Sequence, residues 1–244
     1  MRAVAILTAA GSGTRLGHAL PKALVPLAGI PLVVRAAHAL ASSGLVRRVV
    51  VTAPPDALAE VVAAVGPAAG LEVVPGGATR QASVAAALAR LDDEPGDTVV
   101  LVHDAARPLV PVRVVRRVAG AVALGRSAVV PVLAVADTIK RVAADGEVAE
   151  TLDRRELRAV QTPQGFTLEV LRAAHAAAAD RADDESLAAT DDAGLVEAAG
   201  GRVWTVEGHE DAMKITTPRD LAVATALVQS VVPSPAPSAI GARP

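Results

Sequence analysis

The chain of 244 residues contains no cysteine, and aromatic residues make up only 1% of it. Without cysteine, the protein can form neither a disulfide framework nor a thiolate metal site. With one Phe, one Trp and no Tyr, it also offers few side chains on which the bases of single-stranded nucleic acids could stack. These absences disfavour a disulfide-rich secreted domain and a single-strand binder, and they leave Ala, Val and Leu to build the core.

An excess of charge of one sign is also lacking, since 24 Lys and Arg residues face 26 Asp and Glu. We therefore expect no nucleic-acid partner and no membrane-surface partner. Apolar residues reach 52%, but charges or prolines interrupt each apolar run well before the roughly 18 residues that a membrane span requires. The chain starts with a strand pattern instead of the charged and long apolar regions of a signal peptide, so we expect a cytoplasmic protein.

Continuous β-branched runs alternate with alanine-rich helical segments. Such runs are typical of parallel strands buried on both faces, and the alternation predicts an α/β domain of three layers. The expected strands cover residues 2–8, 47–52, 71–74, 98–103, 127–132 and 202–207, and the expected helices cover residues 32–42, 56–65, 80–90, 111–124, 167–180, 191–199 and 218–229. Residues 1–229 would form a single domain. The Pro-, Ser- and Ala-rich residues 230–244 are expected to be a disordered tail or a linker remnant.

Residues 137–160 depart from this alternation. Short polar strands flank Asp145-Gly146, a dipeptide that favours a tight hairpin turn. A hairpin with little apolar surface is unstable on its own in water. We therefore expect this arm to pack on a second copy of the protein in a homodimer; the alternative is that it folds back on its own domain.

Residues 9–17 are rich in glycine and alanine, and they follow the apolar residues 4–7 and precede Pro21-Lys22. Small residues allow backbone N–H groups to approach an oxyanion, Arg15 offers a planar fork of donors, and Lys22 adds a point charge. This pattern predicts a phosphate-binding loop. The alternative is a plain turn between a strand and a helix.

Two common phosphate-binding motifs do not match this loop. A P-loop needs Gly-Lys-Ser/Thr at a set distance from its first glycine, but Lys22 is followed by Ala23. The dinucleotide fingerprint has a small residue where this chain has Leu16, and the second expected strand ends in Thr52 instead of an acidic residue that would hold a ribose. A nicotinamide-dependent oxidoreductase is therefore disfavoured.

Further polar residues follow the third and fourth expected strands, at the edge where parallel sheets bind ligands. Gly76-Gly77 precedes Arg80 and Ser83, and two glycines would let main-chain groups read the flat edge of a base. The fourth strand leads into Asp104 and Arg107. A carboxylate at the end of a buried strand is costly unless it holds a cation or several donors. Asp104 is thus a candidate ligand for Mg²⁺ or a ribose; an ion pair with Arg107 or a helix cap is the alternative.

Seven motifs occur in order between about residues 3 and 228. They are Ala-Ala-Gly-Ser-Gly-Thr-Arg-Leu-Gly with Pro-Lys, His-Asp-Ala-Ala-Arg-Pro, Asp-Thr-Ile-Lys-Arg, Leu-Asp-Arg, Gln-Thr-Pro-Gln-Gly-Phe, Thr-Asp-Asp-Ala and Met-Lys-Ile-Thr-Thr-Pro-Arg-Asp-Leu. The first motif alone is typical of nucleotidyltransferases in general. Together, the seven resemble the 2-C-methyl-D-erythritol 4-phosphate cytidylyltransferase family. The resemblance implies a Rossmann-like nucleotidyltransferase fold with a mostly parallel twisted sheet and a protruding β-hairpin arm.

The resemblance also implies a reaction. CTP and methylerythritol 4-phosphate would give CDP-methylerythritol and pyrophosphate, in the non-mevalonate route to isoprenoids. A phosphate oxygen would attack the α-phosphorus of CTP in line, and cations would stabilise the added charge. By analogy with the family, Arg15, Lys22 and Lys214 are catalytic, and the cofactor is Mg²⁺ or another divalent cation, with Asp104 as a ligand.

The family pattern further assigns binding residues. The contacts of CTP fall on Ala9, Ala10, Gly11, Gly13, Gly77, Ser83 and Asp104. Those of methylerythritol phosphate fall on Asp104, Arg107 and Thr190, with Thr138 and Arg154 from the arm of the neighbouring copy. Position 78 is Ala, where some family members have an acid beside the base, so the mode of cytosine recognition is left open.

Two other functions compete with this one. A cytidylyltransferase for another pentitol phosphate, such as ribitol 5-phosphate, would use the same loop and the same cations. A non-catalytic nucleotide sensor would bind CTP but would not need the three cations Arg15, Lys22 and Lys214.

Overall fold

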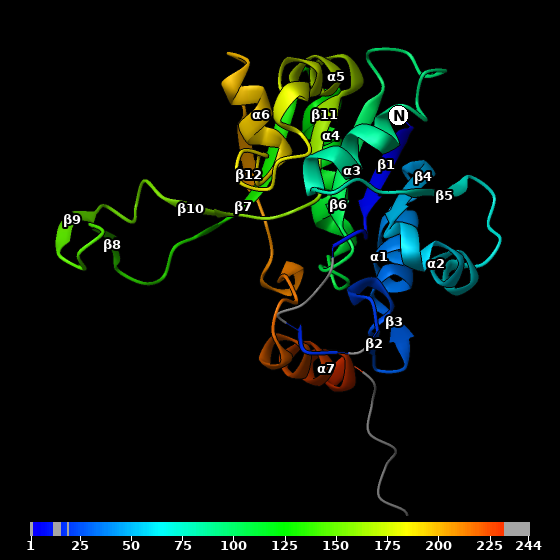
Figure 1. The fold of residues 1–244 in the computed structure, drawn as a ribbon, viewed down its shortest axis with the longest axis horizontal. Coiled ribbons are helices and arrows are strands. Elements are labelled where there is room, and N and C mark those ends of the chain that lie inside the picture. The colour runs from blue at the N-terminus through cyan, green and yellow to red at the C-terminus, as the bar shows by residue number, and fades with distance from the viewer. Residues whose placement is uncertain (1, 12–15, 19, 232–244) are drawn as a thin grey trace, which may run out of the picture.

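The structure is a computed structural model that describes residues 2–11, 16–18 and 20–231. A sheet of eight strands forms its centre (Figure 1). The strand order is β10-β7-β11-β6-β1-β4-β5, with β12 also paired to β7. The bounds are β1 (Ala3–Thr8), β4 (Val46–Ala53), β5 (Leu71–Pro75), β6 (Val99–Asp104), β7 (Ala128–Ala134), β10 (Arg158–Val160), β11 (Gln164–Thr167) and β12 (Trp204–Glu207). All six strands expected from the sequence are present.

The sheet is mostly parallel, as expected. Strand β1 runs parallel to β4 and β6, β4 to β5, and β12 to β7. The exceptions are β10 and β11, which pair antiparallel with their neighbours and which the sequence analysis missed. Each is only three or four residues long and mixes polar with apolar residues, so neither shows the continuous β-branched run by which the parallel strands were identified.

Within the described residues, seven α-helices cover the two faces of the sheet or lie at its edge. They are α1 (Leu32–Ala41), α2 (Leu58–Val65), α3 (Arg80–Leu88), α4 (Val112–Ala123), α5 (Leu168–Ala177), α6 (Asp192–Ala198) and α7 (Pro218–Val231). The core shows the layers, because alternate side chains of a strand point to opposite faces. Leu7 of β1 belongs to the apolar cluster that includes α1, α2 and α4, whereas Ile6 belongs to the cluster that includes α3, α5 and α6. The expected three-layer α/β architecture is confirmed.

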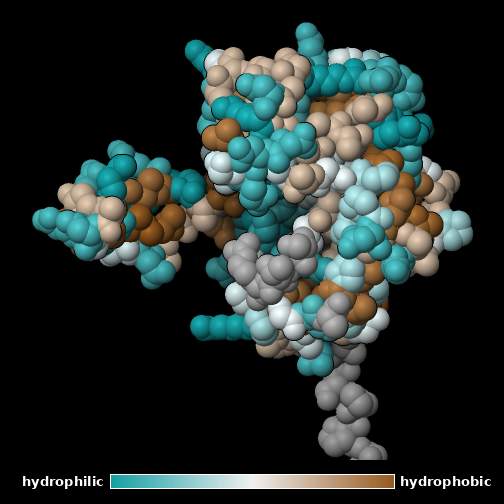
Figure 2. Space-filling view, in the orientation of Figure 1, coloured by the Kyte–Doolittle hydropathy of each residue, from teal (hydrophilic) through white to brown (hydrophobic). Residues whose placement is uncertain are grey.

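The expected hairpin is also present. Strands β8 (Ile139–Val142) and β9 (Val148–Leu152) pair antiparallel and project from the domain instead of folding back on it (Figure 1). Gly146 in the turn has a φ of 93°, a left-handed conformation that glycine adopts at little cost. The arm exposes Val142, Val148 and Val160, and Figure 2 shows apolar surface, drawn in brown, on the arm.

Segments from the two ends of the chain pack together. The short strands β2 (Pro26–Leu27) and β3 (Ile30–Pro31) follow the 3-10 helix η2 (Lys22–Leu24). Leu27 lies in one apolar cluster with Ile215 and Ala224, and the backbone N–H of Ile215 donates a hydrogen bond of 2.8 Å to Ala106. This packing brings the segment before α7, which follows the 3-10 helix η5 (Glu210–Ala212), to the ends of β1 and β6.

Helix α7 continues to Val231, past residue 229, where the sequence analysis ended it. The rest of the expected tail, residues 232–244, lies outside the described residues. Within residues 2–11, 16–18 and 20–231, no helix has the length and apolar character needed to cross a membrane.

Candidate active site

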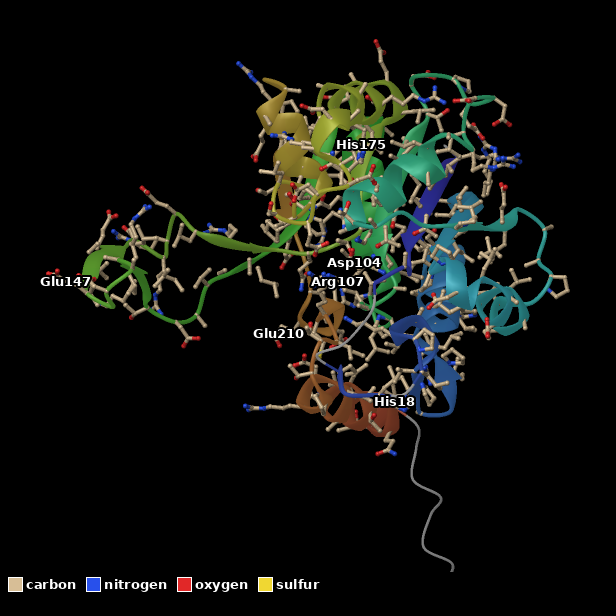
Figure 3. The ribbon with its side chains drawn as sticks, in the orientation of Figure 1. His18, Asp104, Arg107, Glu147, His175 and Glu210 are labelled. Atoms are coloured by element: carbon tan, nitrogen blue, oxygen red, sulfur yellow. The ribbon has the colours of Figure 1, made fainter. Side chains whose placement is uncertain are left out.

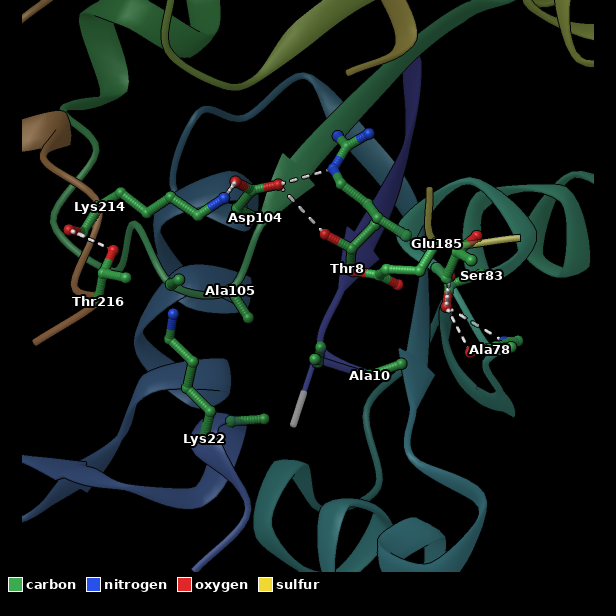
Figure 4. Close-up of a pocket in the computed structure, with 17 residues that line it drawn as sticks. Thr8, Ala10, Lys22, Ala78, Ser83, Asp104, Ala105, Glu185, Lys214 and Thr216 are labelled. Atoms are coloured by element: carbon green, nitrogen blue, oxygen red, sulfur yellow. Dashed lines mark hydrogen bonds and ion pairs between the residues drawn. The ribbon is translucent and has the colours of Figure 1, made fainter. Parts of the chain in front are cut away.

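A pocket of about 370 Å³ opens at the carboxyl ends of β1 and β6 (Figure 4). This is the edge of the sheet at which a ligand was expected. Six segments of the described chain line it: the end of β1, the 3-10 helix η2, the residues around the start of α3, the end of β6, the loop between α5 and α6, and the segment before α7. The lining residues are Thr8, Ala9, Ala10, Gly11, Lys22, Ala23, Gly77, Ala78, Thr79, Arg80, Ser83, Asp104, Ala105, Ala106, Glu185, Lys214 and Thr216.

The Asp104 carboxylate, which is only 5% exposed, lies at the centre of this site. Its Oδ2 atom is 2.9 Å from Nζ of Lys214, and its Oδ1 atom is 3.3 Å from both Nε of Arg80 and the hydroxyl of Thr8. Arg107 is more distant, at 3.9 Å. Burial disfavours the ionised form, but the charges of these three cations outweigh it and hold the pKa of Asp104 well below its usual range. The carboxylate is therefore ionised at neutral pH.

Arg80 is a residue of the site to which the sequence analysis gave no role. Its Nη1 atom is 2.7 Å from the fully buried carboxylate of Asp192 at the start of α6, and that carboxylate is in turn 2.9 Å from Nε2 of His175. Burial lowers the pKa of Arg80, but Asp192 and Asp104 outweigh this effect and raise it. Arg80 thus joins Asp104 to the helical layer in which His175 lies (Figure 3). A position at the start of a helix after two glycines was its only signal in the sequence.

The structure brings together most of the residues predicted to bind CTP. Lys22 and Lys214 point into the same pocket from opposite ends of the chain (Figure 4). The pocket is also lined by the predicted residues Ala9, Ala10, Gly11, Gly77, Ser83 and Asp104. The other two predicted residues of this group, Gly13 and Arg15, lie outside the described residues.

Four predicted residues for methylerythritol phosphate do not line this pocket. Arg107 lies beside it, donates a hydrogen bond of 2.7 Å to the carbonyl of Ala212, and approaches Asp104. Thr190 is exposed just before α6, and Thr138 and Arg154 are exposed on the arm. Arg154 donates a hydrogen bond to the carbonyl of Ala136. The two arm residues were predicted to serve the neighbouring copy, and their exposure keeps them accessible to it.

Glycines are required at the end of the pocket near α3. A Cβ atom at Gly76 would lie 2.5 Å from Cβ of Ala10, and one at Gly77 would lie 2.4 Å from Cβ of Ala82, so neither position tolerates a side chain without movement. The hydroxyl of Ser83 donates to the carbonyl of Thr79 at 2.8 Å and accepts from the N–H of Gly77 at 3.1 Å. These bonds hold a narrow wall of backbone that a flat ring can approach.

The buried imidazole of His103 orders the loop that starts at Asp104. Nε2 of His103 lies 3.2 Å from the carbonyl of Arg107, which can only accept, so the ring proton is assigned to Nε2. Nδ1 of the neutral ring then accepts from the hydroxyl of Thr162, 2.8 Å away, and this hydroxyl in turn accepts from the N–H of Asp104. Burial lowers the pKa of His103 to about 4. The ring is therefore neutral at physiological pH, and it connects the end of β6 to the following turn.

One carboxylate suits the site for a divalent cation carried by a nucleotide. Among the described residues, no group of three or more His, Asp or Glu side chains forms a metal cage. Mg²⁺ bound with a nucleotide needs only one or two protein carboxylates, because phosphates and waters supply the other oxygens. Asp104, ionised at the wall of the pocket, fits this role.

Comparison with known proteins identifies related chains. The family model for 2-C-methyl-D-erythritol 4-phosphate cytidylyltransferase matches residues 3–230. A Saccharopolyspora erythraea protein of that name is 54% identical over 230 residues, which cover 93% of this chain and 100% of the relative. A Frankia casuarinae protein of that name is 49% identical over 233 residues, covering 96% and 84%. The crystal structure of the Thermus thermophilus enzyme of that name matches with a TM-score of 0.75 and 38% identity, covering 94% of this chain and 100% of that one.

The burial of His103 predicts a loss of stability in mild acid. Between its ordinary pKa of 6.5 and its folded value of about 4, the unfolded chain takes up a proton that the folded protein does not bind. The free energy of unfolding should therefore be highest above pH 6.5 and fall by about 3 kcal/mol as the pH is lowered towards 4. Urea unfolding across this range measures it. His103→Gln should flatten the dependence and the exposed control His38→Gln should not; an equal slope in His103→Gln and the wild type would contradict the assignment.

Proposed function

The chain belongs to the 2-C-methyl-D-erythritol 4-phosphate cytidylyltransferase family, and we propose that its pocket transfers CMP from CTP to 2-C-methyl-D-erythritol 4-phosphate. The products are CDP-methylerythritol and pyrophosphate, in the non-mevalonate route to isoprenoids. The observation that carries this assignment of the site is the convergence of Lys22 and Lys214 on one pocket beside the ionised Asp104. Cations at that place suit a reaction between two anions.

CTP would lie along the pocket with its base near α3 and its phosphates near the lysines. Gly77 and Ser83 form the narrow wall of backbone at one end, which suits a flat pyrimidine. Gly11 follows β1 at the wall of the pocket, and the small residues that come after it in the sequence suit the approach of backbone N–H groups to phosphate. Arg15, from the same part of the sequence, completes the proposed set of cations for the triphosphate. Asp104 lies between the two ends and is suited to the ribose.

The chemical step would need charge stabilisation rather than a covalent catalyst. A phosphate oxygen of the acceptor forms a new bond to the α-phosphorus of CTP, and the bond from that phosphorus to the oxygen of the leaving pyrophosphate breaks. The attacking phosphate oxygen is already anionic, so no general base is required. Lys214, whose side chain is 44% exposed and is oriented by Asp104 at 2.9 Å, and Lys22 would stabilise the negative charge in the transition state.

We propose Mg²⁺ or another divalent cation as the cofactor. Asp104 would hold it together with phosphate oxygens of CTP. When bound, the cation would neutralise part of the charge on the triphosphate.

The acceptor would bind between two copies of the chain. Asp104 and Arg107 come from one copy, near the pocket, with Thr190 at the start of α6, while Thr138 and Arg154 come from the arm of the other. The support for a homodimer is the projecting arm with its exposed valines (Figure 2), because apolar surface on an isolated hairpin favours burial against a partner. The absence of cysteine supports a cytoplasmic location.

Release of pyrophosphate tests the proposed function. The protein should release pyrophosphate from CTP in the presence of Mg²⁺ and methylerythritol 4-phosphate, and more slowly with ribitol 5-phosphate. Faster turnover with ribitol 5-phosphate would favour the other pentitol phosphate as the acceptor. Tight binding of CTP with no release for either acceptor would favour a nucleotide sensor.

Lys22→Ala and Lys214→Ala should each lower kcat by about 10²–10³-fold, because removing one oriented donor from a reacting phosphorus costs roughly 3 kcal/mol of transition-state stabilisation. The Kd for CTP, measured by calorimetry, should change much less. Arg90→Ala removes an exposed cation that pairs with Glu72 outside the pocket, and it should leave kcat unchanged. Wild-type turnover in either lysine variant would exclude that lysine from the reaction.

Arg154→Ala should raise KM for methylerythritol 4-phosphate and leave KM for CTP unchanged. The control Arg155→Ala removes the exposed neighbour that pairs with Asp153, and it should change neither KM.

Mixed dimers show whether Arg154 on the arm of one subunit serves the site of the other. A dimer of one Arg154→Ala subunit and one Lys214→Ala subunit would contain one intact site only if Arg154 serves its partner. Activity of the mixture no higher than that of the two parents would contradict this arrangement.

A further inference from the structure

A second acidic side chain lines the pocket at the end that is assigned to the base. Among the described lining residues, only Asp104 and Glu185 are acidic. Figure 4 shows Glu185 towards the end occupied by Ser83 and Ala78, with Lys22 and Lys214 towards the opposite end. Glu185 therefore lies near the base rather than beside the cations that face the phosphates, and the mechanism above does not use it.

The loop that carries Glu185, between α5 and α6, is anchored to the start of α3. The hydroxyl of Thr79 donates to the carbonyl of Ala182. The amide of the buried Gln81 spans the loop, because Nε2 donates to the carbonyl of Ala178 at 2.9 Å and Oε1 accepts from the N–H of Ala189 at 2.9 Å. Since Thr79 and Gln81 closely follow Ala78, these bonds hold the loop over the residues assigned to the base.

Within the loop, hydrogen bonds order the turn around Glu185, and none of them, within the described chain, uses the carboxylate of this residue. The carboxylate of Asp184 accepts hydrogen bonds from the N–H and the hydroxyl of Ser186, at 2.8 and 2.6 Å. The N–H of Ala188 donates to the carbonyl of Asp184 at 2.7 Å. Asp184 is thus occupied within the loop, whereas the carboxylate of Glu185 makes no hydrogen bond or ion pair in the part of the chain that the structure describes. A carboxylate held at a pocket wall without a partner can accept a donor from a ligand.

We propose that Glu185 accepts a hydrogen bond from the N4 amino group of cytosine and thereby selects CTP over UTP. Cytosine presents an amino donor at this position, whereas uracil presents a carbonyl oxygen, which a carboxylate repels. Ala78 lines the same part of the pocket and has no carboxylate to offer, so Glu185 is the acid that the described lining residues supply on this side. This inference rests on the proposed function, because it takes the base to lie against the wall that Gly77 and Ser83 form.

The ratio of kcat/KM for CTP to that for UTP tests the proposal, with pyrophosphate release as the measurement. Glu185→Ala should lower this ratio by about tenfold or more. Asp183→Ala removes the exposed acid two positions earlier, which does not line the pocket, and it should leave the ratio unchanged. A wild-type ratio in Glu185→Ala, or an equal fall in both variants, would overturn the proposal.

Glu185→Gln gives a second, directional test. The amide can donate a hydrogen bond to O4 of uracil, so the kcat/KM for UTP should rise above that of the wild type. Unchanged or lower turnover of UTP in this variant would overturn the role of Glu185. These outcomes are distinct from a failure of the proposed function, which would appear as no pyrophosphate release from CTP by the wild-type protein.

Discussion

The buried carboxylate of Asp104 is the charge on which the site depends. Removing a carboxylate from water is costly, and the cost is offset only when cations and donors surround it. Here the cations come from three places: Arg80 at the start of α3, Lys214 before α7, and Arg107 in the turn after β6. One ion cluster therefore ties the C-terminal segment and the third helix to the end of a central strand, and it orients the ammonium group of Lys214.

The same cluster extends away from the pocket into the helical layer. Arg80 passes from Asp104 to Asp192, which His175 also contacts. Gln164 of β11 accepts hydrogen bonds from the backbone N–H groups of Asp192 and the next residue, at 3.2 and 3.1 Å. The start of α6 is thus held by groups from α3, α5 and β11. The loop that carries Glu185 leads into this end of α6. Thr190, which is proposed to contact the acceptor, lies just before the helix begins.

Local charge, rather than the charge of the whole protein, suits the site to its substrates. The chain has a formal net charge of −2, yet Lys22, Arg80 and Lys214 line one pocket. The two anionic substrates that are proposed to meet there need an electrostatic attraction that acts over a few ångströms. The acids are few and separated: Asp104 lies among the cations, and Glu185 lies towards the other end.

Properties that depend on local order along the chain were predictable from the sequence. The β-branched runs identified the parallel strands, Asp145-Gly146 identified the hairpin, and the spacing of motifs indicated the family. The short strands β10 and β11 were missed, because each has only three or four residues of mixed polarity and is defined by its pairing with neighbouring strands instead of by its own composition.

The sequence by itself thus determined the α/β architecture, the arm and the residues that resemble those of the family. Only the tertiary structure decided that Arg80 bridges Asp104 and Asp192, and that the loop with Glu185 lies against the start of α3. The physical reason is that a contact between residues far apart in the chain arises from the packing of whole elements. Such a contact leaves no periodicity and no fixed spacing in the sequence.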